Sequence, residues 1–352
     1  MKIAQLVSNF HRVSPLSNHA IYSHVGTLAD NLKKLGHKVT LFASGDSQTN
    51  ATLISSASVA LSQTLLEGPT ATHYTHRLIA KCYEQAKNFD IIHSHFSLLS
   101  SFYTRLTATP TIQSIHSPIS AAIRPLLVEY KDNFYIAFSQ AQKRAFPELN
   151  WVGTIYHGVD MKTFTYNPKP EEYFLYLGRI TEEKGVHFAI EAAKAAKVPL
   201  YIAGRSYQAE GYWHNHIEPH IDGVMVRYIG EAGLEKKIEL LRNAKALLFP
   251  TQYEEVFGYV MIEAMACGTP VIGWNKGSVP EVVQDGESGF VVNSVKEMIR
   301  AIKNINTISR KATRDRAQRL FSVEKMVSGY EKVYKRVIDM VKKKKKVTTL
   351  KR

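Results

Sequence analysis

The stretch Glu255-Val-Phe-Gly-Tyr-Val-Met-Ile-Glu263, continued by Ala264-Met-Ala-Cys-Gly-Thr-Pro-Val-Ile272, changes its local pattern twice. Residues 260–266 are apolar enough for a buried helix, Gly268 is a typical C-terminal stop, and Pro270 leads into a strand. We therefore expect Glu255 in the loop before the helix and Glu263 a little over a turn inside it. A loop, a helix, a stop and a buried strand in this order indicate a parallel α/β sheet.

The same alternation runs through the rest of the chain. In the first half we expect a helix at about 21–35 and strands at 2–7, 39–42, 89–93, 111–115 and 135–138. In the second half we expect strands at 173–177, 198–202, 224–228, 246–249 and 271–272. The proline-bearing stretch 166–170 is the predicted connector, which gives Rossmann-like domains at 1–166 and 171–322. Ligands bind at the carboxyl ends of parallel strands, so two such sheets are expected to face a cleft.

The helix start after Glu255 has the chemistry of a nucleotide-sugar site. Gly258 lets a ligand approach the backbone closely, and the N–H groups of Tyr259 and Val260 face a helix N-terminus suited to phosphate. Glu255 in the loop and Glu263 in the helix could bind sugar and ribose hydroxyls. The alternative is that both acids are ordinary solvated helix carboxylates.

Two cations follow the strand at 173–177, where ligand contacts are expected. Arg179 offers a planar fork and Lys184 a mobile point charge, so together they could clamp a diphosphate. Cations aimed at a leaving diphosphate stabilise the transition state more than the ground state. The alternative is a pair of ordinary surface cations. The sequence has no Asp-x-Asp run near this position, which favours cationic side chains over a divalent metal.

In this order, the motifs resemble the retaining glycosyltransferases of family 4, which have the two-domain GT-B architecture. The resemblance covers most of the chain. It rests on the two glutamates and on the stretches 35–46, 90–95, 157–160, 178–185, 201–204, 226–230, 246–250 and 277–281.

The resemblance implies a role for each matching residue. Glu263 would hold the donor ribose, and Glu255 would face the donor sugar and stabilise an oxocarbenium-like state. His116, after the strand at 111–115, would face that sugar from the first domain. The other implied donor contacts are Val256, Phe257, Gly258, Tyr259, Val260, Gly204, Tyr228 and Asn18. Relatives usually carry a glycine pair in the loop after the first strand, whereas residues 15–20 contain none.

The implied activity is metal-independent transfer of a hexose with retention of configuration, and no cofactor is expected. The donor would be a nucleotide-diphosphate sugar, with UDP-glucose ahead of GDP-mannose, and the acceptor a saccharide or a lipid-linked sugar. The alternatives are a GT-B nucleotide-sugar epimerase, a phosphorylase, and a non-catalytic nucleotide-sugar-binding protein. The resemblance also implies that a C-terminal helix at 323–341 packs back on the first domain.

Composition adds few constraints on the fold but bears on partners. The formal net charge is +14, and the tail at 342–352, where five lysines are consecutive, contributes part of it. That tail could hold an anionic membrane surface, or it could be a solvated, disordered end. No zinc-ligand set or RNA-binding aromatic signature accompanies it, which argues against a dedicated nucleic-acid protein. His93 and His95 alternate on a strand without a third metal ligand, so we expect them to line or support the cleft.

The cysteine content and hydropathy indicate a cytoplasmic protein, with contact to the inner face of a membrane only through the tail. Cys82 and Cys267 are the only cysteines, and buried free thiols are expected. No apolar run reaches membrane-spanning length, and no signal-peptide pattern opens the sequence.

Overall fold

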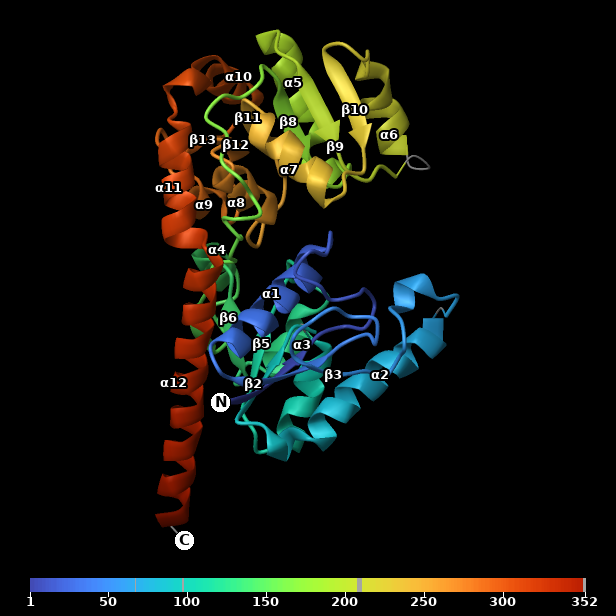
Figure 1. The fold of residues 1–352 in the computed structure, drawn as a ribbon, viewed down its shortest axis with the longest axis vertical. Helices are drawn as coiled ribbons and strands as arrows, with labels where there is room; N and C mark the ends of the chain where they lie inside the picture. The colour runs from blue at the N-terminus through green and yellow to red at the C-terminus, as the bar shows by residue number, and fades with distance from the viewer. Residues whose placement is uncertain (67, 97, 208–210, 351–352) are drawn as a thin grey trace. The chain divides into compact units, whose positions relative to one another are not determined.

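The computed structural model describes residues 1–66, 68–96, 98–207 and 211–350. The chain divides into two compact units, whose elements are labelled in Figure 1. The first unit comprises Met1–Phe138, Gln142–Ile155 and Met326–Arg352, and the second comprises Ser139–Ala141 and Tyr156–Lys325. The chain thus passes into the second unit at Tyr156, and the expected connector at 166–170 lies inside that unit.

The first unit contains a parallel sheet with strand order β3-β2-β1-β4-β5-β6-β7. Its strands are β1 (Lys2–Leu6), β2 (Lys38–Phe42), β3 (Thr52–Ile54), β4 (Ile91–Ser94), β5 (Thr111–Ser114), β6 (Phe134–Ala137) and β7 (Trp151–Thr154). Its helices are α1 (Ala20–Lys34), α2 (Gly68–Glu84) and α3 (Arg124–Glu129); α4 (Gln140–Ala145) begins in the second unit. Short 3₁₀ turns lie at Leu61–Gln63, Ala86–Asn88 and Leu99–Leu106.

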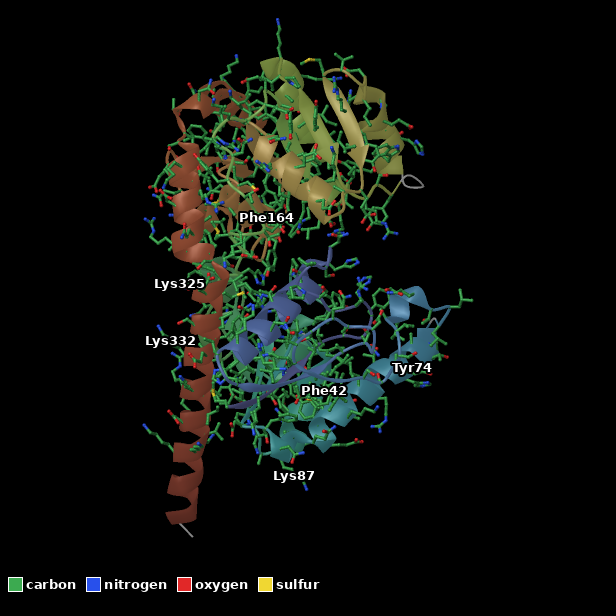
Figure 2. All side chains as sticks on the ribbon, viewed as in Figure 1. Phe42, Tyr74, Lys87, Phe164, Lys325 and Lys332 are labelled. Atoms are coloured by element: carbon green, nitrogen blue, oxygen red, sulfur yellow. The ribbon has the colours of Figure 1, made fainter. Side chains whose placement is uncertain are left out.

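The alternating side chains of β2 show that helices cover both faces of this sheet. Phe42 belongs to the buried cluster that contains Leu78 and Ile79 of α2, and its side chain is labelled in Figure 2. The preceding residue, Leu41, belongs instead to the cluster that contains Val25 of α1. Successive side chains of a strand point to opposite faces, so α1 and α2 cover opposite faces of the sheet.

The second unit repeats the arrangement with strand order β10-β9-β8-β11-β12-β13, again with parallel pairing. Its strands are β8 (Phe174–Leu177), β9 (Leu200–Ala203), β10 (Val226–Gly230), β11 (Ala246–Phe249), β12 (Val271–Trp274) and β13 (Gly289–Val292). Its helices are α5 (Val186–Ala196), α6 (Gly211–His216), α7 (Leu234–Asn243), α8 (Tyr259–Ala266), α9 (Val279–Val282), α10 (Val295–Asn304) and α11 (Arg310–Phe321). Short 3₁₀ turns are η4 (Glu182–Lys184), Glu218–His220 and Ile305–Thr307.

The last helix, α12 (Val323–Leu350), joins the first unit from Met326 onward. Its buried stripe comprises Met326, Val327, Tyr330, Val333, Tyr334, Val337 and Ile338, whereas Lys332 is exposed (Figure 2). The predicted helix end at 341 was wrong, because the helix continues through the lysine run to Leu350. Lysine is a good helix former, so the run does not end the helix. Of the predicted tail, residues 351–352 lie outside the described residues.

Both cysteines are buried and free, as expected. Among the residues described, none of the helices is long and apolar enough to cross a bilayer.

Candidate active site

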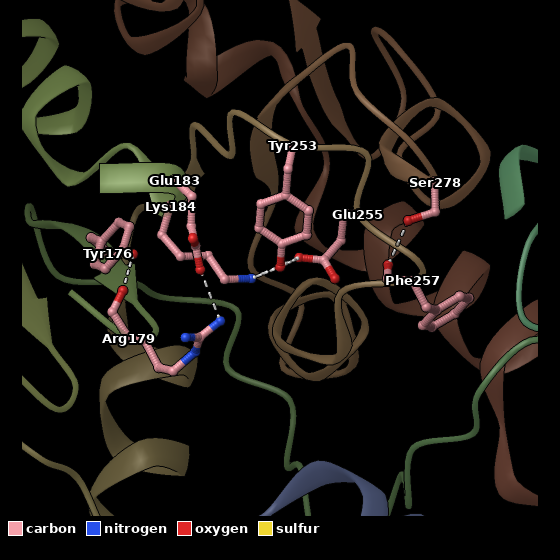
Figure 3. Close-up of polar contacts among 8 residues, drawn as sticks. All are labelled: Tyr176, Arg179, Glu183, Lys184, Tyr253, Glu255, Phe257 and Ser278. Carbon is pink, nitrogen blue, oxygen red and sulfur yellow. Dashed lines mark hydrogen bonds and ion pairs between the residues drawn. The ribbon is translucent and has the colours of Figure 1, made fainter. Parts of the chain in front are cut away.

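The carboxyl ends of β8 and β11 bring a lysine and a glutamate together in the second unit. Lys184 ends η4, the short turn after β8, and Glu255 lies in the loop between β11 and α8. The Lys184 ammonium donates to Glu255 Oε2 at 2.7 Å, and the two side chains are only 16% and 12% exposed. Figure 3 shows the Lys184 side chain reaching across to this loop. An ion pair that is mostly shielded from water holds both charged groups in one place.

Tyr253 completes this group, and sequence reasoning missed it. Its hydroxyl donates to Glu255 Oε2 at 2.8 Å and also accepts a hydrogen bond from the Lys184 ammonium (Figure 3). Burial and the Glu255 carboxylate raise the pKa of Tyr253, so the phenol keeps its proton and stays a donor. The only local signal was its position, since Tyr253 stands two residues before Glu255 in the sequence.

Arg179 follows β8 and stands at the edge of this group. Its guanidinium pairs with Glu183 at 3.1 Å, and both side chains are 53% exposed (Figure 3). Its backbone carbonyl accepts from the buried Tyr176 hydroxyl at 2.8 Å, which anchors the turn. Arg179 is close enough to Tyr253 for each to shift the pKa of the other. An exposed, weakly held guanidinium can turn toward an anionic ligand at little cost.

Two glycines shape the loop that carries Glu255. Gly258 is the N-cap of α8 with φ of +79°, and a Cβ there would meet the Met261 side chain at 2.7 Å. Gly277 has φ of +52°, and a Cβ there would meet the Glu255 backbone at 2.3 Å. Its N–H donates to the Glu254 carboxylate at 2.7 Å. The Glu255 backbone is therefore packed so tightly that only glycine fits beside it.

The residues after Glu255 bury their side chains rather than presenting them. Val256 and Phe257 are buried, and the Phe257 carbonyl accepts from the Ser278 hydroxyl at 2.8 Å (Figure 3). Tyr259 and Val260 begin α8 and are half-buried, and the Tyr259 ring stacks on His157 at 4.3 Å between centroids. Any ligand contact from Val256 or Phe257 would therefore use the backbone.

Glu263 lies on α8, about a turn after its start, as predicted. Its carboxylate pairs with Lys237 of α7 at 2.6 Å, and the side chains are 12% and 16% exposed. It therefore belongs to a second ion pair, separate from that of Lys184 and Glu255. No sequence pattern predicted a role for Lys237, because only the packing of α7 on α8 brings it to Glu263.

The remaining donor contacts expected in this unit, Gly204 and Tyr228, lie after β9 and within β10. Gly204 follows β9 with φ of +143°, and a Cβ there would meet the Gly178 carbonyl at 1.9 Å. The Tyr228 hydroxyl donates to the Gly204 carbonyl at 3.0 Å and lies 3.1 Å from the Ser206 hydroxyl. These contacts hold the turn after β9 against the turn after β8, which carries Arg179.

Glu281, in the 277–281 motif, has a structural role within the second unit. Its carboxylate accepts from the backbone N–H groups of Gln140 and Ala141 at 2.7 and 2.6 Å. It also accepts from the Tyr156 hydroxyl at 3.1 Å. The Glu281 carboxylate is therefore hydrogen-bonded to groups of the protein itself.

His116 lies in the first unit, just after β5, among other histidines. Its Nε2 is 2.9 Å from His95 Nδ1, and its ring lies 4.6 Å from the Phe138 ring. Burial, with His24 and His93 nearby, holds the pKa of His116 well below its usual range. Burial also lowers the pKa of His24 to about 3. His24 and His116 are therefore neutral at physiological pH.

The described residues contain one group that could hold a metal ion, namely His24, His95 and His116. One ring nitrogen of each lies within 4.8 Å of the others. His93, which we expected to line or support the cleft together with His95, contacts Tyr334 and Ser114 at 2.6 and 2.8 Å.

The loop before α1 has no glycine and packs closely against Gly26 of that helix. A Cβ at Gly26 of α1 would meet Ser14 and Pro15 backbone atoms at 2.8 Å, so the glycine needed for close packing is in the helix. Asn18 lies in this loop and is exposed to solvent.

Two family models match the chain. Residues 22–163 match Glycosyltransferase Family 4, and residues 161–319 match Glycosyl transferases group 1. Together with two parallel-sheet domains, these matches define a glycosyltransferase of the GT-B fold. The chain belongs to glycosyltransferase family 4.

Individual relatives agree with this assignment. An uncharacterized glycosyltransferase of Methanocaldococcus jannaschii is 26% identical over 286 residues, which cover 74% of this chain and 79% of that protein. A phosphatidyl-myo-inositol mannosyltransferase of Mycolicibacterium smegmatis is 26% identical over 314 residues, covering 77% and 76%. The crystal structure of Anabaena HepE in complex with UDP-glucose superposes with a TM-score of 0.69 at 18% identity, covering 97% and 100%.

Proposed function

We propose that this glycosyltransferase transfers a hexose from a nucleotide-diphosphate sugar with retention of anomeric configuration and without a divalent metal. The observation that carries the proposal is the shielded group of Lys184, Glu255 and Tyr253. It places a fixed cation beside a fixed carboxylate at the carboxyl ends of two parallel strands, where ligands of such sheets bind.

The chemistry assigned to these residues follows from where charge moves. When the bond between the anomeric carbon and the phosphate oxygen breaks, the electron pair stays on the diphosphate. Lys184 and Arg179 would stabilise that growing negative charge, while Glu255 would balance the positive charge on the sugar. The acceptor hydroxyl would attack from the same face and give its proton to the departing phosphate. Glu263 would hold the ribose, and His116 would contact the transferred sugar.

The proposed donor is UDP-glucose, with GDP-mannose as the next candidate. HepE, which shares the fold, is solved with UDP-glucose, and the Mycolicibacterium relative is a mannosyltransferase. That relative is named for a phosphatidyl-inositol acceptor, which supports a lipid-linked acceptor alongside a saccharide.

Release of UDP from UDP-glucose by the purified protein tests the proposal without a known acceptor. Slow hydrolysis is expected with UDP-glucose, at equal rate with and without EDTA, and slower release of GDP from GDP-mannose. Lys245→Ala is the matched control, since Lys245 forms an ion pair with Glu172 at 2.8 Å and is 18% exposed. Absence of release from every nucleotide sugar, or release that EDTA abolishes, would contradict the proposal.

A further inference from the structure

A chain of hydrogen bonds between buried side chains leads from α12 to His95. Tyr334 of α12 is fully buried, and its hydroxyl lies 2.6 Å from His93 Nδ1. The Gln5 amide nitrogen of β1 donates to the same hydroxyl at 2.9 Å. The Gln5 amide oxygen in turn lies 2.9 Å from His95 Nε2. A residue near the end of the sequence is thereby connected to the first strand and to the residue after β4.

The chain continues from His95 to His116. His95 Nδ1 and His116 Nε2 are 2.9 Å apart, which is a hydrogen-bond distance. His95 is buried and His116 is half-buried. A neutral imidazole has one N–H and one acceptor nitrogen. The role of one ring nitrogen in one contact therefore fixes the role of the other nitrogen in the next contact.

The Gln5 amide decides the direction of these bonds. Its nitrogen donates to Tyr334, so its oxygen faces His95 and can only accept. His95 must then carry its proton on Nε2, which leaves Nδ1 as an acceptor. His116 must therefore donate from Nε2, and its Nδ1 is the acceptor nitrogen of that ring. Were the amide turned over, each of these roles would be reversed.

A metal ion fits the same rings less well than a hydrogen bond does. Two nitrogens bound to one tetrahedral zinc at about 2.05 Å each would be about 3.3 Å apart. The His95 and His116 nitrogens are closer than that, at 2.9 Å. His24 Nε2 also has a protein partner, the Tyr330 hydroxyl at 3.2 Å.

We propose that Gln5, His95 and Tyr334 are positioning residues that fix His116 as the Nε2–H tautomer. In this tautomer any hydrogen bond at His116 Nδ1 is one that the ring accepts, and α12 helps to set that state by supplying Tyr334. The tautomer is inferred from the hydrogen bonds alone, whereas its effect on sugar transfer rests on the proposed function.

Nuclear magnetic resonance tests the tautomer in the full-length protein. Long-range ¹H–¹⁵N spectra separate protonated from unprotonated ring nitrogens, and the His116 signals are those lost in His116→Gln. We expect protonated Nε2 and unprotonated Nδ1 in His116, unchanged by EDTA. A proton on Nδ1, on both nitrogens, or a spectrum altered by EDTA would overturn the proposal.

Paired substitutions of His95 test the consequence for catalysis. Asparagine can place its amide oxygen near the position of Nδ1, whereas leucine has no acceptor. We expect His95→Leu to lower kcat for donor hydrolysis by about tenfold or more, because lost outer partners commonly cost that much. His95→Asn should recover most of the loss, and KM for the donor should change little in either variant.

His37→Leu is the control for general loosening of α12. It removes the 3.1 Å contact between His37 and Glu331 of α12, outside the chain to His116. It should change the melting temperature but not kcat. Equal kcat in His95→Asn and His95→Leu, measured below the melting temperature of both, would refute the positioning role. If the wild type hydrolyses no nucleotide sugar, the proposed function fails while the spectra still judge the tautomer.

Discussion

Replacing Lys184 with alanine removes the only lysine that contacts Glu255 within the described residues. The ammonium lies 2.7 Å from Glu255 Oε2 and is 16% exposed, so water screens it little. At an effective dielectric constant of about 20, a unit charge about 4 Å away is stabilised by about 4 kcal/mol. Loss of one preorganised contact to a developing oxyanion costs about 2.7 to 4 kcal/mol, which is about a hundredfold to a thousandfold in rate.

The assay is UDP release from saturating UDP-glucose, with thermal unfolding followed in parallel. Lys184→Ala should release UDP at least about a hundredfold more slowly than wild type. Its stability should fall by about 1 to 3 kcal/mol, because Glu255 keeps the Tyr253 hydroxyl but loses a charged partner.

Lys245→Ala separates the two effects, since it loses a partly shielded lysine ion pair elsewhere in the same unit. It should keep wild-type activity. A folded Lys184→Ala protein with activity within about threefold of wild type would refute the assignment of Lys184 to the leaving diphosphate.

Four further predictions follow from the same geometry. Transfer from an α-linked donor should give an α-glycoside by NMR, at a rate that EDTA does not change; a β-anomer as the first product would exclude retention. Glu263→Gln should weaken UDP binding about tenfold by calorimetry with kcat nearly intact, because a carboxylate that holds ribose hydroxyls acts in ground and transition state alike; unchanged affinity would exclude that contact. Stability should fall with acid below pH 6.5, because the pKa of His24 is about 3 when folded and the unfolded chain takes up the proton first. One histidine buried in the neutral form lowers the free energy of unfolding by about 1.4 kcal/mol for each pH unit of acidification. A free energy of unfolding in denaturant that is the same at pH 7 and pH 5.5 would contradict neutral burial. A chain ending at Val341 should bind anionic vesicles more weakly than the full chain at low salt, since each basic residue near the bilayer contributes about 1 kcal/mol; equal binding would eliminate the lysine run as an anchor.

The fold was predictable because its signals are local. Buried strands such as β6 (Phe134–Ala137) and β11 (Ala246–Phe249) are short apolar runs in the sequence. Gly36 and Gly268 mark helix ends by their left-handed backbone, with φ of +85° and +82°. Three of the four edge strands, β3, β7 and β13, were missed, whereas the fourth, β10, was expected at 224–228.

The site was predictable only where one motif holds both partners of a contact. Glu255 was placed correctly in a loop and Glu263 in a helix, because both lie within one local unit. Lys237 reaches Glu263 only through helix packing, and Tyr334 reaches Gln5 across 329 positions of sequence. No periodicity or spacing encodes such pairs.

Binding of nucleotide sugars, measured as a thermal-shift panel of UDP-, GDP- and ADP-sugars, tests the central claim most directly. A donor at a hundred times its dissociation constant adds about 2.7 kcal/mol to the stability of the state that binds it, which is readily seen. We predict a clear shift with UDP-glucose, a smaller one with GDP-mannose, and loss of the UDP-glucose shift in a Glu255→Ala, Glu263→Ala double variant. A wild-type protein whose melting temperature no nucleotide sugar raises would contradict the account.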